Sequence, residues 1–249
     1  MPDISQLPRA PIVEALLDIR SEHDRPISEE VLDGFGSVLG PEFSNKLVRQ
    51  SVTGNLKVDR NSAATASAQV STVAYLFRSN DGKWVVQVRK DGFALSRLAP
   101  YVSFEELRAT AERLWGRFAA ETKARKVTRT ALRYINRVVV PRPVERLTDY
   151  FASGPMVGEG IPHGLLNFFV HLELSDPTSS IQTVVNMTVD TAATTPSELP
   201  IIFDIDVFRL TSLPAKGKDL FSQFTALRER KNVVFFESLT ESALELLRR

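Results

Sequence analysis

Two segments of this 249-residue chain, ALLDIRSEHDRPISEEVLDGF (15–35) and ALRYINRVVVPRPVERLTDYF (131–151), match each other at six positions. The matched residues are Ala15, Leu16, Ile19, Glu29, Asp33 and Phe35 in the first segment, and Ala131, Leu132, Ile135, Glu145, Asp149 and Phe151 in the second. Each segment begins with the branched aliphatic residues of a strand and continues into acidic residues typical of a helix start. The match predicts that the chain repeats one strand-and-helix opening.

The first half continues with three predicted strands and a helix. The opening strand is expected at 11–23 and a helix after Ser28, which is a good N-cap, up to Gly40. Residues 41–62 show no regular period and predict an insertion or irregular loop. Strands are expected at 65–78, 84–90 and 93–98, the last two joined by the hairpin signal Asp91-Gly92. Ser103 and Glu106 form a capping-box pair that opens a helix over 103–124.

The second half predicts the same order of elements. A strand is expected at 127–140 and a helix at about 143–152, followed by three strands and a helix that starts near Gly217 and includes NVVFFESL. The three strands are expected at 165–174, 180–190 and 199–210, and a short terminal helix at 240–247.

The order β-α-β-β-β-α, occurring twice, predicts an α+β protein with a predominantly antiparallel sheet and packed helices. The two similar halves are residues 1–125 and 126–249, and we expect one continuous globular unit because no Pro/Gly/Ser-rich linker separates Lys123 from Val127. The alternative is that two unrelated α+β segments have similar orders by accident.

Composition excludes several classes of protein. The chain has no cysteine, which excludes disulfides, thiol nucleophiles and thiolate metal sites. Its formal net charge of +1 argues against a globally electropositive nucleic-acid coat. The first twenty residues lack the apolar run of a signal peptide, and we expect a soluble cytoplasmic protein with no membrane contact and no cofactor.

Positive charge is concentrated around the second opening strand. The segment 113–146 holds two acidic residues and ten basic ones: Arg113, Arg117, Lys123, Arg125, Lys126, Arg129, Arg133, Arg137, Arg142 and Arg146. Because side chains alternate along a strand, Arg129, Arg133 and Arg137 are expected on one face, each about 13 Å from the next.

This arginine row has three interpretations. It could form cross-strand ion pairs with Glu173, Asp190, Asp204 and Asp206, which lie on predicted strands of the same half. It could contact phosphates of a nucleic acid or another polyanion, or it could form a protein interface. The candidate binding residues are therefore Arg129, Arg133 and Arg137, together with Tyr134 and Asn136 of the same strand.

Asp204 and Asp206 in FDIDVF are the candidate metal ligands. Two residues apart on a strand, they share a face and could hold one divalent cation. No spacing identifies a third ligand, and ion pairs with the nearby arginines are the simpler interpretation. The chain shows no P-loop, G-x-S-x-G elbow, dinucleotide fingerprint or His-E-x-x-His pair, so we predict no catalytic residue.

The segments APIVEALLDIR, RYINRVVVP, LTDYF and FFESLTE together resemble a sporadically distributed bacterial family of proteins of about this length with no assigned function. The shared landmarks are Pro11, Ile12 and Glu14, the strand Arg133 to Arg137, and Phe236, Thr240 and Glu241. The resemblance implies an accessory or phage-defence setting and transfers no catalytic residue.

Three functions follow as expectations. The first is a non-enzymatic binding or assembly module with a protein partner or self-association. The second is a nucleic-acid-binding protein that uses segment 113–146, and the third is a metal-dependent enzyme or small-ligand binder centred on Asp204 and Asp206.

Overall fold

A computed structural model gives the structure of the chain and describes residues 7–57, 65–158, 160, 165–217 and 219–248. The strands are β1 (Ile12–His23), β2 (Asn45–Lys57), β3 (Thr65–Arg78), β4 (Trp84–Arg89), β5 (Gly92–Leu98), β6 (Ala124–Pro141), β7 (Phe169–Asp176), β8 (Ile181–Val189) and β9 (Glu198–Pro214). The α-helices are α1 (Glu29–Asp33), α2 (Phe35–Leu39), α3 (Phe104–Glu121), α4 (Gln223–Ser238) and α5 (Glu241–Arg248). Short 3-10 turns are η2 (Pro41–Phe43), η3 (Leu147–Asp149) and η4 (Thr191–Ala193).

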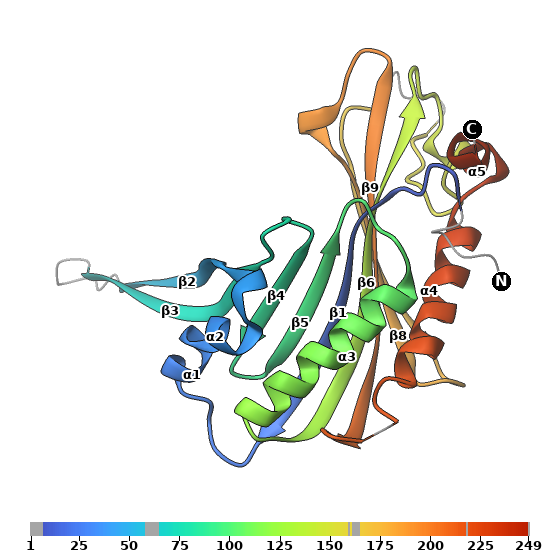
Figure 1. Cartoon of the computed structure of the whole chain (residues 1–249). Helices are drawn as coiled ribbons and strands as arrows, with labels where there is room; N and C mark the ends of the chain where they lie inside the picture. Colours follow the sequence, from blue (N-terminus) through green and yellow to red (C-terminus); the bar gives the residue numbers. More distant parts are fainter. Residues whose placement is uncertain (1–6, 58–64, 159, 161–164, 218, 249) are drawn as a thin grey trace.

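The described strands form one antiparallel sheet in the order β2-β3-β4-β5-β1-β6-β9-β8-β7. The prediction of an α+β fold with a predominantly antiparallel sheet is confirmed. The two opening strands, β1 and β6, pair with each other at the middle of the sheet. Helices α3 and α4 lie against one face of it, α3 over β5, β1 and β6, and α4 over β6 and β9 (Figure 1). None of the described helices has the length and apolar character needed to cross a membrane.

Alternation along the strands divides the sheet into a helix-covered face and an open face, which is the one turned away from α3 and α4. On β1, Ala15, Leu17 and Ile19 are completely buried beneath the helices, whereas Leu16, Asp18 and Arg20 point to the open face. The helix-covered face carries the hydrophobic core. Burial of its large aliphatic and aromatic side chains is the dominant stabilising term.

Helix α3 forms as the sequence predicts. The hydroxyl of Ser103 accepts a hydrogen bond from the backbone N–H of Glu106, which satisfies one of the free donors at the helix start. Leu107, Leu114 and Phe118 recur at helical spacing and are fully buried against the sheet.

The β5–β1 pair needs a glycine at its start. Gly92 lies opposite Arg20 in the ladder, and a Cβ atom at position 92 would lie 2.2 Å from the carbonyl oxygen of Ile19. The same residue closes the Asp91-Gly92 turn that the sequence predicts, so one position sets both the hairpin and the approach of β1.

Two predicted elements are wrong. Part of 41–62 is a regular strand, β2, which pairs with β3 along its whole length; residues 41–43 form the turn η2, and 58–62 lie outside the described residues. Polar Ser, Thr, Asn and Gln residues give β2 no hydrophobic alternation, since an edge strand beyond the helices has no core to face. The helix predicted at 143–152 is only the turn η3, because the backbone beyond it pairs with the segment after α4 instead: Phe151 forms a β-bridge with Leu239, and Ala152 N–H donates to the carbonyl of Ser238.

The matched residues of the two openings do not lie on equivalent faces of the sheet. Ile19 is buried beneath the helices, whereas its counterpart Ile135 lines the open face. Leu16 and Leu132 show the reverse arrangement. A shift of one residue reverses the face of every side chain in a strand, so this alignment does not itself superimpose the two strands.

Candidate functional site

The open face contains a groove of about 1340 Å³. Its lining residues come from β1 to β6, β9 and the β4–β5 turn, so strands form both its floor and its walls. Aliphatic side chains, among them Leu16, Leu98 and Ile135, alternate there with charged ones. A concave surface of this size with convergent polar groups is the usual form of a binding site.

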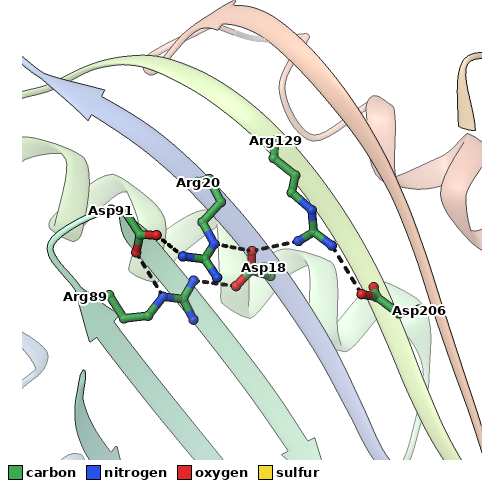
Figure 2. Close-up of polar contacts among 6 residues, drawn as sticks. All are labelled: Asp18, Arg20, Arg89, Asp91, Arg129 and Asp206. Carbon is green, nitrogen blue, oxygen red and sulfur yellow. Dashed lines mark hydrogen bonds and ion pairs between the residues drawn. The ribbon is translucent and has the colours of Figure 1, made fainter. Parts of the chain in front are cut away.

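A network of six charged residues crosses the groove floor, and we call it the Asp18 network: Asp18, Arg20, Arg89, Asp91, Arg129 and Asp206. Figure 2 shows these side chains lying in a line from the β4–β5 turn across β1 and β6 to β9. Asp18 is the centre, since it forms ion pairs with Arg20 (3.3 Å), Arg89 and Arg129 (3.2 Å).

The outer ends of the Asp18 network are closed by two further aspartates. Asp91 pairs with both Arg20 and Arg89, and Asp206 pairs with Arg129 at 3.2 Å. Three arginines therefore face three aspartates, and the network is electrically neutral. The side chains of Asp18 and Arg89 are only 8% and 10% exposed, so each of these charges depends on the other for solvation.

A second chain of polar contacts runs from β6 to β7 on the same face. The guanidinium of Arg133 donates to both carboxylate oxygens of Asp204, at 2.8 and 2.7 Å. Asn186 donates to Asp204 at 3.3 Å, and its amide oxygen contacts Nδ1 of His171 at 2.7 Å. His171 Nε2 lies 3.1 Å from Glu173. Four neighbouring strands are thus linked by side chains as well as by backbone hydrogen bonds.

These surroundings shift several pKa values. Burial raises the pKa of Asp206 above its ordinary value, against the opposing influence of Arg129 and Arg133. The hydrogen bonds to Asp204 raise the pKa of Arg133. Hydrogen bonds to Asn186 and Glu173 raise the pKa of His171, because both ring nitrogens face acceptor oxygens and only the protonated ring can donate to both.

The predicted binding residues lie on both faces of β6. Arg129, Arg133 and Arg137 share the open face, and each pairs with an aspartate; the partner of Arg137 is Asp190, at 3.4 Å. Tyr134 and Asn136 lie instead on the helix-covered face and are almost completely inaccessible. Asn136 donates to the backbone carbonyl of Phe203 at 3.0 Å, which ties β6 to β9 in the core.

The predicted metal ligands Asp204 and Asp206 share the open face, as their spacing requires. Arginines already contact both carboxylates, Arg133 at Asp204 and Arg129 at Asp206. Within the described ranges, no group of three or more His, Cys, Asp or Glu residues could hold a metal ion.

The basic segment 113–146 does not form one surface. Arg113 and Arg117 lie on α3, on the other side of the sheet from Arg129 and Arg133, and Arg117 donates to backbone carbonyls of α2. Acidic residues from elsewhere in the chain pair with much of the remaining charge: Glu42 with Arg113, Asp24 with Arg125 and Glu22 with Lys126. The local excess of charge in the sequence is therefore largely neutralised in space.

Sequence reasoning did not find Asp18, Arg20, Arg89 and Asp91. They belong to the first half, and only the pairing of β1 with β6 brings them beside Arg129. A usable signal was present, because Asp18 interrupts the aliphatic run ALLDI at a position that alternation assigns to the open face.

No protein-family model matches the chain, and no curated protein is similar to it at a significant level.

Proposed function

We propose that this chain is a non-enzymatic binding module that holds a protein partner on its open face. The observation that supports this best is the groove itself, whose charged floor is neutral and already ordered before any partner arrives. Side chains held in ion pairs lose little further freedom on binding, which lowers the entropic cost of association.

The chemistry of the groove suits a protein surface. Aliphatic side chains stand between ion pairs, and Leu210, 66% exposed, lies at its edge. Apolar contacts interleaved with arginines are typical of protein interfaces, where arginine is enriched. The arginines of the Asp18 network are already paired with aspartates and its net charge is zero, so the alternative of a nucleic-acid-binding protein has less support.

The alternative of an enzyme or metal-dependent ligand binder at Asp204 and Asp206 also has less support. A general acid or base needs a free path to its substrate, and a metal ion needs carboxylates that are not already neutralised. The raised pKa of Asp206 is the observation in favour of this alternative, and desolvation on the sheet accounts for it.

The resemblance of the RYINR strand and the FFESLTE segment to a sporadically distributed bacterial family suggests the setting. Within this proposal the partner belongs to a bacterial accessory or phage-defence system. We further propose that residues 1–125 and 126–249 arose by duplication. The arrangement that supports this is the pairing of each opening strand with the last strand before its following helix, β1 with β5 and β6 with β9.

Co-purification with a matched pair of variants tests the binding function. The native protein is purified from its own cells, and bound proteins are quantified by mass spectrometry for wild type, Leu210→Arg and Val102→Arg. Leu210 lies in the groove and Val102 does not, yet both are exposed aliphatics, so both variants should fold. We expect Leu210→Arg to lose a stoichiometric partner that Val102→Arg retains. Equal recovery from both variants, or no stoichiometric partner at all, would contradict the proposal.

A further inference from the structure

The edge strand β2 carries an exposed apolar and basic surface of its own. Strand β3 pairs with β4 only over Tyr75–Arg78, so most of β2 and β3 forms a two-stranded arm that extends past the rest of the sheet (Figure 1). Five of the exposed aliphatic residues gather on this arm: Leu47, Val48, Val52, Val70 and Val73. Val52 and Val70 are direct cross-strand partners, 65% and 57% exposed.

A two-stranded arm of this kind leaves backbone hydrogen-bonding groups and aliphatic side chains exposed to water. A two-stranded ribbon without a third strand or a helix is only marginally stable, and the outer edge of β2 presents unpaired backbone donors and acceptors. Addition of a further strand would satisfy the edge and cover the aliphatic side chains. The charge of the edge then decides which strand fits.

The β2 edge is basic and the opposite edge of the sheet is acidic. Lys46 and Arg49 lie on β2, which has no acidic residue in its sequence. Lys46 pairs with Asp33, whereas Arg49 forms no ion pair with any described residue. Strand β7 at the other edge carries Glu173 and Asp176 and no lysine or arginine; Asp176 pairs with Arg230, so the exposed negative charge of this strand is that of Glu173. It also exposes aliphatic and aromatic side chains, Phe169 and Leu174.

We propose that strand β7 of a second copy of this chain docks against β2 and continues the sheet from one molecule to the next. Because the nine described strands alternate in direction, the two edge strands run the same way. A second copy in the same orientation therefore adds its β7 parallel to β2, with both open faces on the same side.

Charge and hydrophobicity match in this arrangement. Arg49 lies on the open face because it lines the groove. Glu173 lies on the same face because it belongs to the chain of polar contacts that runs from Asp204 through Asn186 and His171. Their neighbours Val48 and Leu174 lie on the other face, where they can pack together. Pairing of β2 with a second β2 would instead bring the unpaired Arg49 of both copies to one junction, and like charges across a strand pair are unfavourable.

Such a contact joins two different surfaces, so association continues from copy to copy until a ring closes or a filament forms. It uses the two sheet edges, although Arg49 also lines the rim of the groove. The co-purification test above changes Leu210 on β9, away from both edge strands, so the outcomes of the two tests can be told apart.

Sedimentation velocity over a range of protein concentrations tests this contact with charge-reversal variants. Wild type should show species larger than a monomer that grow with concentration. Arg49→Glu and Glu173→Arg should each shift the protein to monomer, since like charges then meet at every junction. The double variant, and an equimolar mixture of the two single variants, should both restore association, because every junction again joins opposite charges.

The control is Arg146→Glu, which reverses an exposed arginine that lies away from both edges and should associate as wild type does. Circular dichroism confirms that each variant is folded. Wild type that stays monomeric at all concentrations would overturn the proposal. Association that is changed by Arg49→Glu alone would also overturn it and would indicate β2–β2 pairing. Association that neither variant changes would overturn it as well.

Discussion

Arg133 lies directly opposite Asp206 in the β6–β9 ladder, yet its guanidinium binds Asp204, two residues earlier on β9. Asp206 is bound instead by Arg129, which lies opposite Leu210. The arginines thus reach diagonally across the ladder, and the two aspartates have different environments. Asp204 accepts a bidentate pair and a third hydrogen bond from Asn186, whereas one oxygen of Asp206 is buried without a hydrogen-bond partner among the described residues.

This difference predicts that the same substitution, Asp to Asn, costs much more stability at position 204 than at position 206. Asp204→Asn removes the charge that Arg133 binds and should lower the free energy of unfolding by about 1.5–3 kcal/mol, the usual worth of hydrogen bonds to charged groups. Asp206→Asn removes a carboxylate that burial already disfavours and should change that free energy by about 0.5 kcal/mol or less. Urea unfolding at pH 7 measures both. Equal losses in the two variants would contradict the distinction.

The raised pKa of Asp206 predicts a particular pH dependence. Native Asp206 binds its proton more tightly than the unfolded chain, whose pKa is near the ordinary 3.8, so the native state holds more protons in the window above that value. The contribution of Asp206 to stability is present at low pH and is lost as the pH rises through the native pKa. In urea titrations from pH 3 to pH 7, the stability of wild type relative to Asp206→Asn should therefore fall with rising pH. A relative stability that rises over this range would show that the native pKa is lowered.

Two of the histidines should titrate on opposite sides of the ordinary value of 6.5. Burial lowers the pKa of His23, and hydrogen bonds to Asn186 and Glu173 raise the pKa of His171. NMR titration of the imidazole Cε1 protons should give a higher midpoint for His171 than for His23. The variant Asn186→Ala removes the first of the two causes and should lower only the His171 midpoint. If the midpoint of His171 lies below that of His23, the polar chain from Asp204 to Glu173 is not formed.

Two glycines provide a matched test of the backbone geometry. A Cβ at position 92 would lie 2.2 Å from the carbonyl oxygen of Ile19, so Gly92→Ala should cost about 3 kcal/mol or more by forcing β1 and β5 apart. Gly116 lies within α3 with nothing within 4 Å of an added Cβ, and Gly116→Ala should stabilise the protein by about 0.5–1 kcal/mol. Thermal unfolding of both variants checks the two signs. If Gly92→Ala lowers the unfolding temperature only slightly, the β4–β5 hairpin can move away from β1 without a large loss of stability.

The pairing of the arginine row predicts weak contact with nucleic acids. Phosphates would have to displace Asp204 and Asp206 from their arginines, so affinity for duplex DNA or single-stranded RNA at 0.15 M salt should not exceed the ordinary non-specific range of about 10⁻⁴–10⁻⁶ M. Fluorescence anisotropy with wild type and Arg133→Ala measures this. Tighter, strongly salt-dependent binding that Arg133→Ala weakens would favour the nucleic-acid alternative.

The sequence predicted the local features well and the long-range ones poorly. Alternation correctly placed Arg129, Arg133 and Arg137 on one face, and three of the four acidic partners named for them, Asp190, Asp204 and Asp206, do pair with them. Glu173 contacts His171 instead. Asp18 was missed because its role depends on β1 lying between β5 and β6, which local periodicity does not encode. Strand β2 was missed for a related reason, since its polar sequence reflects a position beyond the core.

The central position of β1 also affects synthesis of the protein. Strand β1 is synthesised before both of its neighbours and can pair with β5 on one side, but its other side has no neighbour until β6 follows α3 out of the exit tunnel. During that interval one edge of β1 has no strand to pair with, although it will lie in the middle of the finished sheet. The ion pair between Asp18 and Arg129 cannot form until β6 has emerged. Translational pausing within or just after the β6 codons would lengthen this exposure, and the yield of native protein should be sensitive to codon choice there.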